Sequence, residues 1–158
     1  MNLKILLFST VLFVSSITSA KERARPNSKG GNYLFEINSS VVFEGSEELF
    51  ELGFDLERFV EGANHHFALG LASELSFTEG NNDYYLGPLF SFYYHHFKAF
   101  FTTGVLTDFD EKVEWKSRLG LGYEFVFAYH FVFIPSVSVD YLEGNLYPVL
   151  GAGVACEF

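Results

Sequence analysis

All five histidines of the chain lie in three short aromatic motifs, HHF at 65–67, HHF at 95–97 and YHF at 129–131. Imidazole is a common zinc ligand, so the repetition raises the question of a metal site. The motifs recur at intervals of 30 and 34 residues on separate short segments, and Cys156 is the only cysteine. Zinc sites need ligands in a fixed tetrahedral geometry, which this spacing does not indicate. Tyr, His and Phe suit a membrane–water interface, so we expect an aromatic rim and neither a metal nor a cofactor.

The segments that would position these motifs alternate with period two. In VEWKSRLGLGYEF, residues 113–125, the apolar side chains fall on one face and the charges and glycines on the other. Successive side chains of a strand point to opposite faces, so this segment is predicted to be a two-faced strand. The same test predicts seven further strands, at residues 34–44, 49–58, 65–77, 84–94, 97–106, 130–141 and 146–158. Each is near or above the roughly 9–11 residues that a tilted strand needs to cross a bilayer.

The connections between these segments are of two kinds, which alternate along the chain. One kind is acidic and rich in turn residues: EGSEE (44–48), TEGNND (78–83), TDFDEK (107–112) and LEGN (142–145). The other kind is VEGANHH (60–66), YYHHF (93–97) and FAYHF (127–131), which carry the histidines. In an up-and-down meander alternate turns lie at opposite ends. We therefore expect all the histidines at one rim and the acidic turns at the other.

The composition of the two faces decides which one meets water. The apolar face has no charged residue in the strand interiors and no glycine, whereas eight glycines lie on the opposite face. Eight strand-interior glycines would only weaken a sheet that faced water, but they make room in a narrow lumen. Charge on a lipid-facing site costs ~2–4 kcal/mol at the midplane, which explains its exclusion. We predict an all-β fold, an eight-stranded antiparallel up-and-down transmembrane β-barrel. Its predicted lumen charges are Glu36, Glu51, Asp55, Glu57, Glu74, Lys98, Glu114, Lys116, Arg118, Glu124 and Asp140.

The N-terminal region is predicted to be separate from the barrel. Residues 1–20 resemble a secretory signal peptide, with Lys4, a short apolar run and small residues up to Ala20. Residues 21–32, KERARPNSKGGN, are predicted to form a flexible basic periplasmic tail, and residues 33–158 the barrel. The formal net charge of -10 disfavours a nucleic-acid partner.

The last residues, LGAGVACEF, place Leu150, Ala152, Val154, Cys156 and Phe158 on the apolar face. This ending resembles the C-terminal assembly signal of bacterial outer-membrane barrels, which closes on an aromatic residue. With the eight alternating segments, residues 33–158 resemble in pattern a small barrel of the OmpA/OmpX type. The resemblance implies a location in the bacterial outer membrane and recognition by the barrel-assembly machinery. Cys156 departs from the bulky residue usual at its position. Pro88 and Pro135 interrupt predicted strands, where we expect bulges or register breaks.

We expect a monomer in contact with outer-membrane lipid and lipopolysaccharide, with a structural or envelope-interaction role and a lumen filled by polar side chains. Deacylases and palmitoyltransferases exist on this architecture. However, the chain has no His-x-Ser and no histidine on the acidic turns, so we expect no catalysis. One alternative is a narrow cation-preferring channel. A second is a secreted soluble lipocalin-like barrel that binds an apolar ligand.

Overall fold

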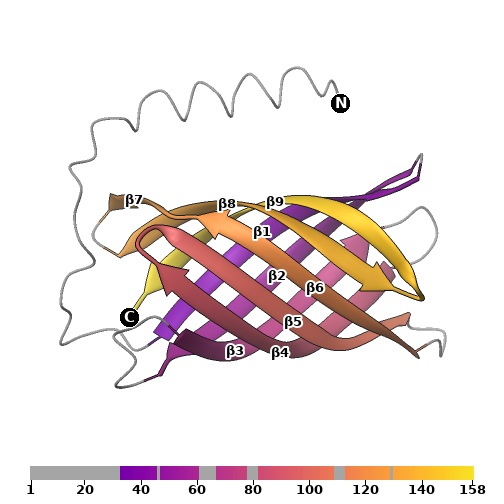
Figure 1. Ribbon diagram of the computed structural model, residues 1–158, viewed down its shortest axis with the longest axis horizontal. Helices are drawn as coiled ribbons and strands as arrows, with labels where there is room; N and C mark the ends of the chain where they lie inside the picture. The colour runs from indigo at the N-terminus through magenta and orange to yellow at the C-terminus, as the bar shows by residue number, and fades with distance from the viewer. Residues whose placement is uncertain (1–32, 46, 61–66, 78–81, 109–112, 129) are drawn as a thin grey trace, which may run out of the picture.

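The computed structural model describes residues 33–45, 47–60, 67–77, 82–108, 113–128 and 130–158. The strands are β1 (Tyr33–Glu44), β2 (Glu47–Phe59), β3 (Phe67–Phe77), β4 (Asn82–Tyr94), β5 (Phe97–Asp108), β6 (Val113–Tyr123), β7 (Phe125–Ala128), β8 (Phe131–Leu142) and β9 (Asn145–Glu157). β6 and β7 are one barrel strand interrupted at Glu124, since both pair with β8. The fold is therefore the predicted eight-stranded antiparallel barrel (Figure 1).

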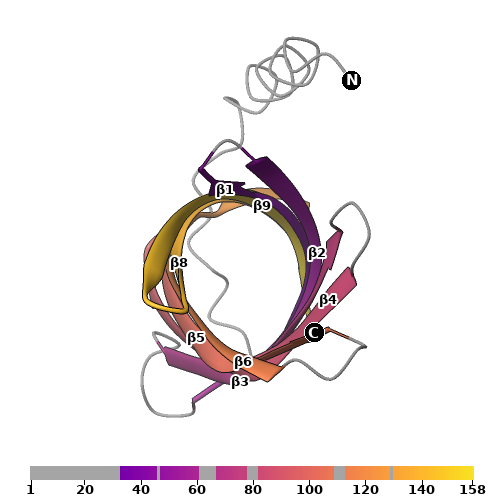
Figure 2. The same cartoon turned by 90° about the vertical axis from the view of Figure 1, so that its right-hand side faces the viewer.

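The sheet closes on itself without a crossover. Each strand pairs with its neighbours in sequence, and β1 pairs with β9 to complete the ring (Figure 2). At the seam the backbones of Tyr33 and Phe158 exchange two hydrogen bonds, of 3.1 and 3.0 Å. Closure matters because an open sheet edge in hydrocarbon would leave N–H and C=O groups without partners. No helix among the described residues is long and apolar enough to cross a bilayer.

The ladder registers fix how strongly the strands are staggered. A trace through successive partners runs Leu34, Glu57, Gly70, Leu89, Thr102, Arg118, Asp140 and Tyr147. When the β1–β9 register is continued by two residues, the trace returns to β1 at Glu44, ten residues beyond its start at Leu34. Stagger, strand tilt and barrel width are linked, and eight strands enclose an interior that side chains fill.

The two prolines inside strands do not shift the register, so that part of the expectation is wrong. On both sides of Pro88 the pairs Leu86–Val105 and Leu89–Thr102 keep one register, and the β4–β5 ladder only skips the positions between them. Proline removes a donor without adding a residue, so pairing is lost locally while the alignment stays. Thr102 Oγ1 donates to the Pro88 carbonyl at 2.9 Å.

Pro135 lies on β8 opposite the break between β6 and β7, where the pairing of β8 with that strand is also interrupted. The register shift in this region lies instead between Val126 and Ala128, close to the end of β7.

Burial is inverted relative to a water-soluble protein. Large apolar side chains point outward along every strand, with Leu71 57% and Trp115 70% exposed. The charged side chains Glu51, Lys116 and Arg118 are buried. The orientation predicted from composition is therefore the one in the structure. Aromatic pairs such as Tyr33–Phe158 and Phe67–Phe92 lie on this outer surface at the end of the barrel where β1 begins and β9 ends, with ring centroids 5.9 and 5.0 Å apart.

Candidate functional site in the barrel lumen

Buried side chains fill the lumen in layers. From the end where β1 begins and β9 ends toward the acidic turns, these are an apolar plug, a layer around Lys98, a small cavity, and a layer around Lys116 and Arg118. Alternation places all of these side chains on the inner face, and the stagger of the strands sets which of them meet.

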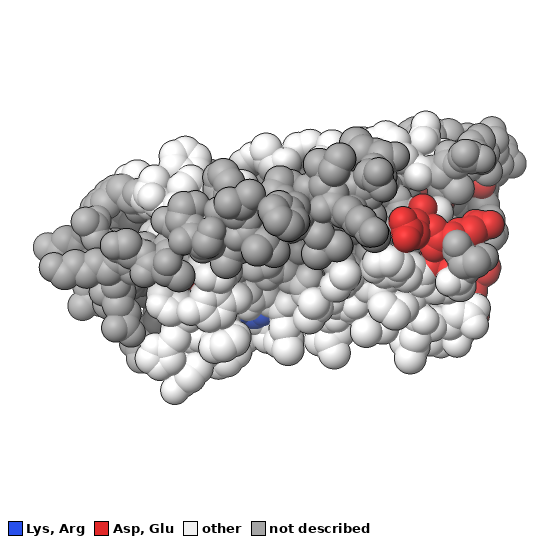
Figure 3. All heavy atoms as spheres, turned by 90° about the horizontal axis from the view of Figure 1, so that it is seen from above, with Lys and Arg blue, Asp and Glu red and all other residues white. Residues whose placement is uncertain are grey.

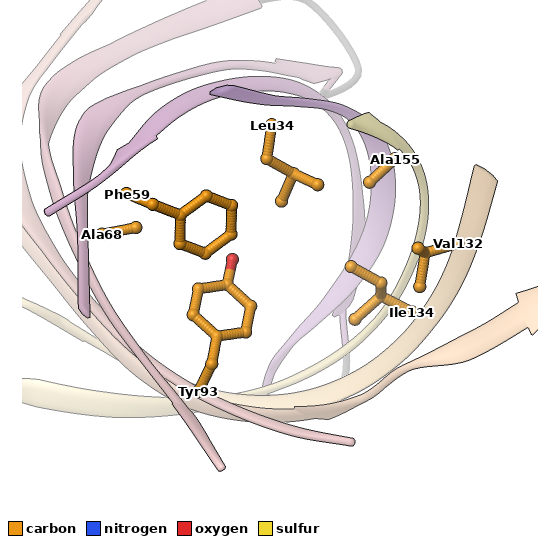
Figure 4. Close-up of a cluster of buried hydrophobic side chains, with 7 residues drawn as sticks. All are labelled: Leu34, Phe59, Ala68, Tyr93, Val132, Ile134 and Ala155. Atoms are coloured by element: carbon orange, nitrogen blue, oxygen red, sulfur yellow. The ribbon is translucent and has the colours of Figure 1, made fainter. Parts of the chain in front are cut away.

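The apolar plug is a cluster contributed by six strands. Its members are Leu34, Phe59, Ala68, Tyr93, Val132, Ile134 and Ala155. Their side chains point inward from opposite walls (Figure 4). The rings of Phe59 and Tyr93 pack with centroids 5.3 Å apart. The phenol of Tyr93 donates a hydrogen bond of 3.0 Å to Glu57, which connects the plug to the layer around Lys98.

The Lys98 layer joins β5 to the opposite wall. Lys98 Nζ lies 2.8 Å from Glu36 Oε2 on β1 and 2.7 Å from Glu57 Oε1 on β2. The ammonium also lies 5.6 Å from the ring centre of Phe100, within cation–π range. Lys98 is buried, and a buried charge is tolerated when it is paired in this way.

The Arg118 layer is denser and ties β6 to β2, β3 and β8. Arg118 Nη2 lies 2.6 Å from Glu51 Oε2 and 2.7 Å from Asp140 Oδ2. Its Nη1 donates to Glu74 and its Nε donates to Asp140. Lys116 Nζ contacts the same three carboxylates at 2.7, 2.8 and 3.1 Å. The two cations and three carboxylates form one network across the lumen.

Hydroxyl groups complete this network. Ser40 and Ser76 donate to Glu51 at 2.8 and 3.2 Å. Alternation predicts that both serines lie on the inner face, but the sequence does not indicate that they donate to a carboxylate on another strand. The role of Tyr85 could not be predicted either, because a tyrosine in a strand does not indicate its partner across the lumen. The ring centre of Tyr85 lies 5.4 Å from Lys116 Nζ, and its hydroxyl is 2.6 Å from Thr102 Oγ1.

The glycines on the inner face make room for these polar side chains. A Cβ at Gly153 would lie 2.1 Å from Glu36 Oε1, and one at Gly53 would lie 2.2 Å from Asn38 Oδ1. At Gly104 the obstacle is backbone, because a Cβ there would lie 2.2 Å from the Leu86 carbonyl oxygen. Glycine therefore allows both the filled lumen and the close approach of β4 and β5.

Between the two charged layers lies a cavity of about 40 Å³, which is large enough for water. Asp55 lines it and accepts one hydrogen bond, of 3.2 Å, from the Asn38 amide. Asp55 is the direct register partner of Glu36 on β1. Like charges on side chains that lie directly opposite each other on paired strands repel and destabilise the pair.

Two further lumen residues lie away from these layers. Glu124 is buried at the break between β6 and β7, where its backbone N–H donates to the His96 carbonyl at 2.7 Å. Glu114 is half-buried near the acidic end of β6. The predicted lumen charges thus divide between the Lys98 layer, the Arg118 layer and these outlying positions.

The two ends of the barrel differ as the connections suggested. His95, His96 and His130 lie on turns at the end where β1 begins and β9 ends, while His65 and His66 are outside the described residues. His96 packs against Tyr123, with ring centroids 5.7 Å apart. Among the described residues no three or more His, Cys, Asp or Glu are placed to hold a metal ion.

The opposite end is acidic. On the face shown in Figure 3, the Asp and Glu side chains gather at that end of the barrel. Glu44, Glu47, Glu48 and Glu143 are exposed there.

Comparison with solved structures identifies the fold. The chain superimposes on Neisserial surface protein A with a TM-score of 0.60 and 8% identity, covering 83% of this chain and 100% of that one. The N-terminal β-barrel domain of Pseudomonas aeruginosa OprF gives a TM-score of 0.57 and 16% identity, covering 82% and 100%. The outer membrane protein Ail of Yersinia pestis, in a phospholipid bilayer nanodisc, gives 0.55 and 11%, covering 81% and 99%. No protein-family model matches the sequence, and no curated protein matches it. The chain therefore has the fold of small outer-membrane barrels.

Proposed function

We propose that this protein is an integral outer-membrane barrel with a structural or envelope-interaction role and no catalytic activity. The observation that carries the proposal is the inverted burial: an apolar outer surface around a buried charged interior. An apolar surface of this extent is unstable in water and stable against acyl chains. The likeness to three outer-membrane barrels supports the same location.

The topology in the membrane follows from the termini. An even number of barrel strands puts Tyr33 and Phe158 at the same end, and a chain exported through residues 1–20 would keep that end in the periplasm. The acidic turns would then face outward, beside the lipopolysaccharide. Leu150, Ala152, Val154, Cys156 and Phe158 remain the proposed signal for the barrel-assembly machinery.

Two layers of ion pairs and the apolar plug support a lumen that is closed to ions. Lys116 and Arg118 bond to carboxylates on the far wall, and the plug packs side chains from six strands. This arrangement favours a structural role over the alternative of a narrow cation channel. Planar-bilayer recordings test the choice: discrete cation-selective steps from the purified protein would contradict the closed lumen.

Membrane fractionation tests the proposed location. We expect the protein in the detergent-extracted outer-membrane fraction, with a folded form that migrates differently on a gel before and after boiling. The same chain recovered from the periplasm without detergent, binding an apolar ligand, would instead support the soluble lipocalin-like alternative. As a matched control, deletion of residues 2–20 should abolish membrane recovery.

The absence of a catalytic role is supported by the placement of the described histidines. His95, His96 and His130 lie at the end where β1 begins and β9 ends, away from the acidic turns. We therefore expect purified protein to leave lipid A and phospholipid acyl chains unchanged. Release or transfer of an acyl chain, measured by mass spectrometry of extracted lipids, would contradict this part of the proposal.

A further inference from the structure

Two carboxylates face each other directly beside the central cavity. Glu36 on β1 and Asp55 on β2 are register partners on the inner face, and both line the cavity. Like charges directly opposite each other destabilise a pair of strands. Asp55 forms no ion pair among the described residues, and the donor it has is the neutral amide of Asn38.

The cations nearby are already paired with other carboxylates. Lys98 on β5 contacts Glu36 and Glu57, while Arg118 on β6 is bound by the carboxylates of its own layer, including Glu74 on β3. On β4, Tyr93 directs its hydroxyl to Glu57. The two layers and the cavity between them contain six carboxylates, Glu36, Glu51, Asp55, Glu57, Glu74 and Asp140, against three cations, Lys98, Lys116 and Arg118. All of these groups except Asp55, which is half-buried, are buried, so part of the negative surplus requires a further positive charge.

The cavity offers the space and the ligands for that compensation. Its volume of about 40 Å³ exceeds the space that one water needs. Asn38, Ser136 and Ser138 line it beside the carboxylates of Glu36, Asp55 and Glu74. Hard cations take carboxylate, carbonyl and water oxygens as ligands. Lys98 and Arg118 also line the cavity, so the charge added between Glu36 and Asp55 has to be small, which favours a monovalent species.

We propose that the central cavity holds one monovalent positive charge between Glu36 and Asp55, either a metal ion (Na⁺ or K⁺) or a proton held by the two carboxyl groups. This charge offsets the repulsion between β1 and β2 and completes the contact between the two charged layers. The site requires the closed barrel, but it does not depend on the role proposed above for the protein.

The test compares purified, folded protein in sodium, potassium and N-methyl-glucamine chloride at equal ionic strength. If a metal ion is bound, the urea midpoint of unfolding is higher in sodium or potassium than in the bulky organic cation, and Asp55→Asn removes that difference. If a proton is held instead, the salts are equivalent. The wild type then shows the infrared carbonyl band of a protonated carboxyl at neutral pH, and Asp55→Asn removes that band.

Equal midpoints in all three salts, together with no carboxyl band that Asp55→Asn removes, would overturn the proposal. Ser91→Ala is the matched control: its hydroxyl is buried in the lumen without a hydrogen-bond partner and does not line the cavity, so it should leave both readouts unchanged. Glu36→Gln, which neutralises the opposite carboxylate, gives the same test if Asp55→Asn does not fold.

Discussion

Replacing Arg118 with alanine removes the side chain that joins the most strands in the lumen. Arg118 is 5% exposed and donates to carboxylates from β2, β3 and β8. In the variant, Lys116 alone would face Glu51, Glu74 and Asp140. Removing one partner of a buried ion pair costs about 3–5 kcal/mol, because it leaves a buried charge uncompensated. That cost corresponds to a loss of roughly two to three and a half orders of magnitude in the folding equilibrium constant.

The measurement is equilibrium unfolding by urea in phospholipid vesicles, followed by the fluorescence of Trp115. Trp115 is the only tryptophan and is 70% exposed on the outer surface, so its emission reports transfer between lipid and water. Arg58→Ala is the matched control. Arg58 lies at the end of β2 with its guanidinium 5.7 Å from the ring centre of Tyr33, a contact that contributes about 0.5–1 kcal/mol at an exposed site.

If Arg118→Ala lowers the free energy of unfolding no more than Arg58→Ala does, the reasoning is refuted. The Arg118 guanidinium would then be solvated in the lumen and unnecessary for stability. Adding Glu74→Gln provides a second check. The carboxylate of Glu74 accepts a hydrogen bond from Arg118 Nη1. Glu74→Gln should therefore lower the free energy of unfolding less in the Arg118→Ala variant than in the wild type. Additive effects of the two substitutions would show that the pair is not coupled.

Three further predictions concern the outer surface and the wall. Leu71→Arg, at the middle of β3, should cost ~2–4 kcal/mol in the same unfolding assay, whereas Leu146→Arg near the acidic turns should cost ~0–1 kcal/mol; equal costs would contradict the membrane orientation. Gly104→Ala places a Cβ 2.2 Å from backbone and should reduce the folded, heat-modifiable band, while Gly151→Ala meets a serine hydroxyl at 2.8 Å and should be tolerated; the reverse order would contradict the close approach of β4 and β5. Lipids brominated near the headgroup should quench Trp115 more strongly than lipids brominated at the chain end, and the opposite order would place this residue at the bilayer centre.

Much of the architecture could be predicted from the sequence because the face of a strand residue is a local property. Alternation put Trp115 on one face and Lys116 and Arg118 on the other, and the composition of the two faces assigned the first to the outside and the second to the lumen. The glycines showed which face was crowded, and the two kinds of turn showed which connections share an end. Pro88 was interpreted less well, because a missing donor interrupts a ladder without requiring a shift in register.

The pairing inside the lumen could not be predicted in the same way. Arg118 and Glu51 are 67 residues apart, and nothing local to either residue makes the other its partner. The carboxylate that an inward side chain meets on the far wall depends on the stagger accumulated around the whole ring. A different stagger would keep every residue on its face but change the partners of Lys98 and Arg118.

Spacing along the chain predicts the number of strands and the difference between the two ends, and composition predicts which face of each strand lines the lumen. The ten-residue stagger, the apolar plug, the two charged layers and the cavity beside Asp55 depend on the closed barrel. These features join side chains from opposite walls, and opposite walls face each other only after β1 has paired with β9.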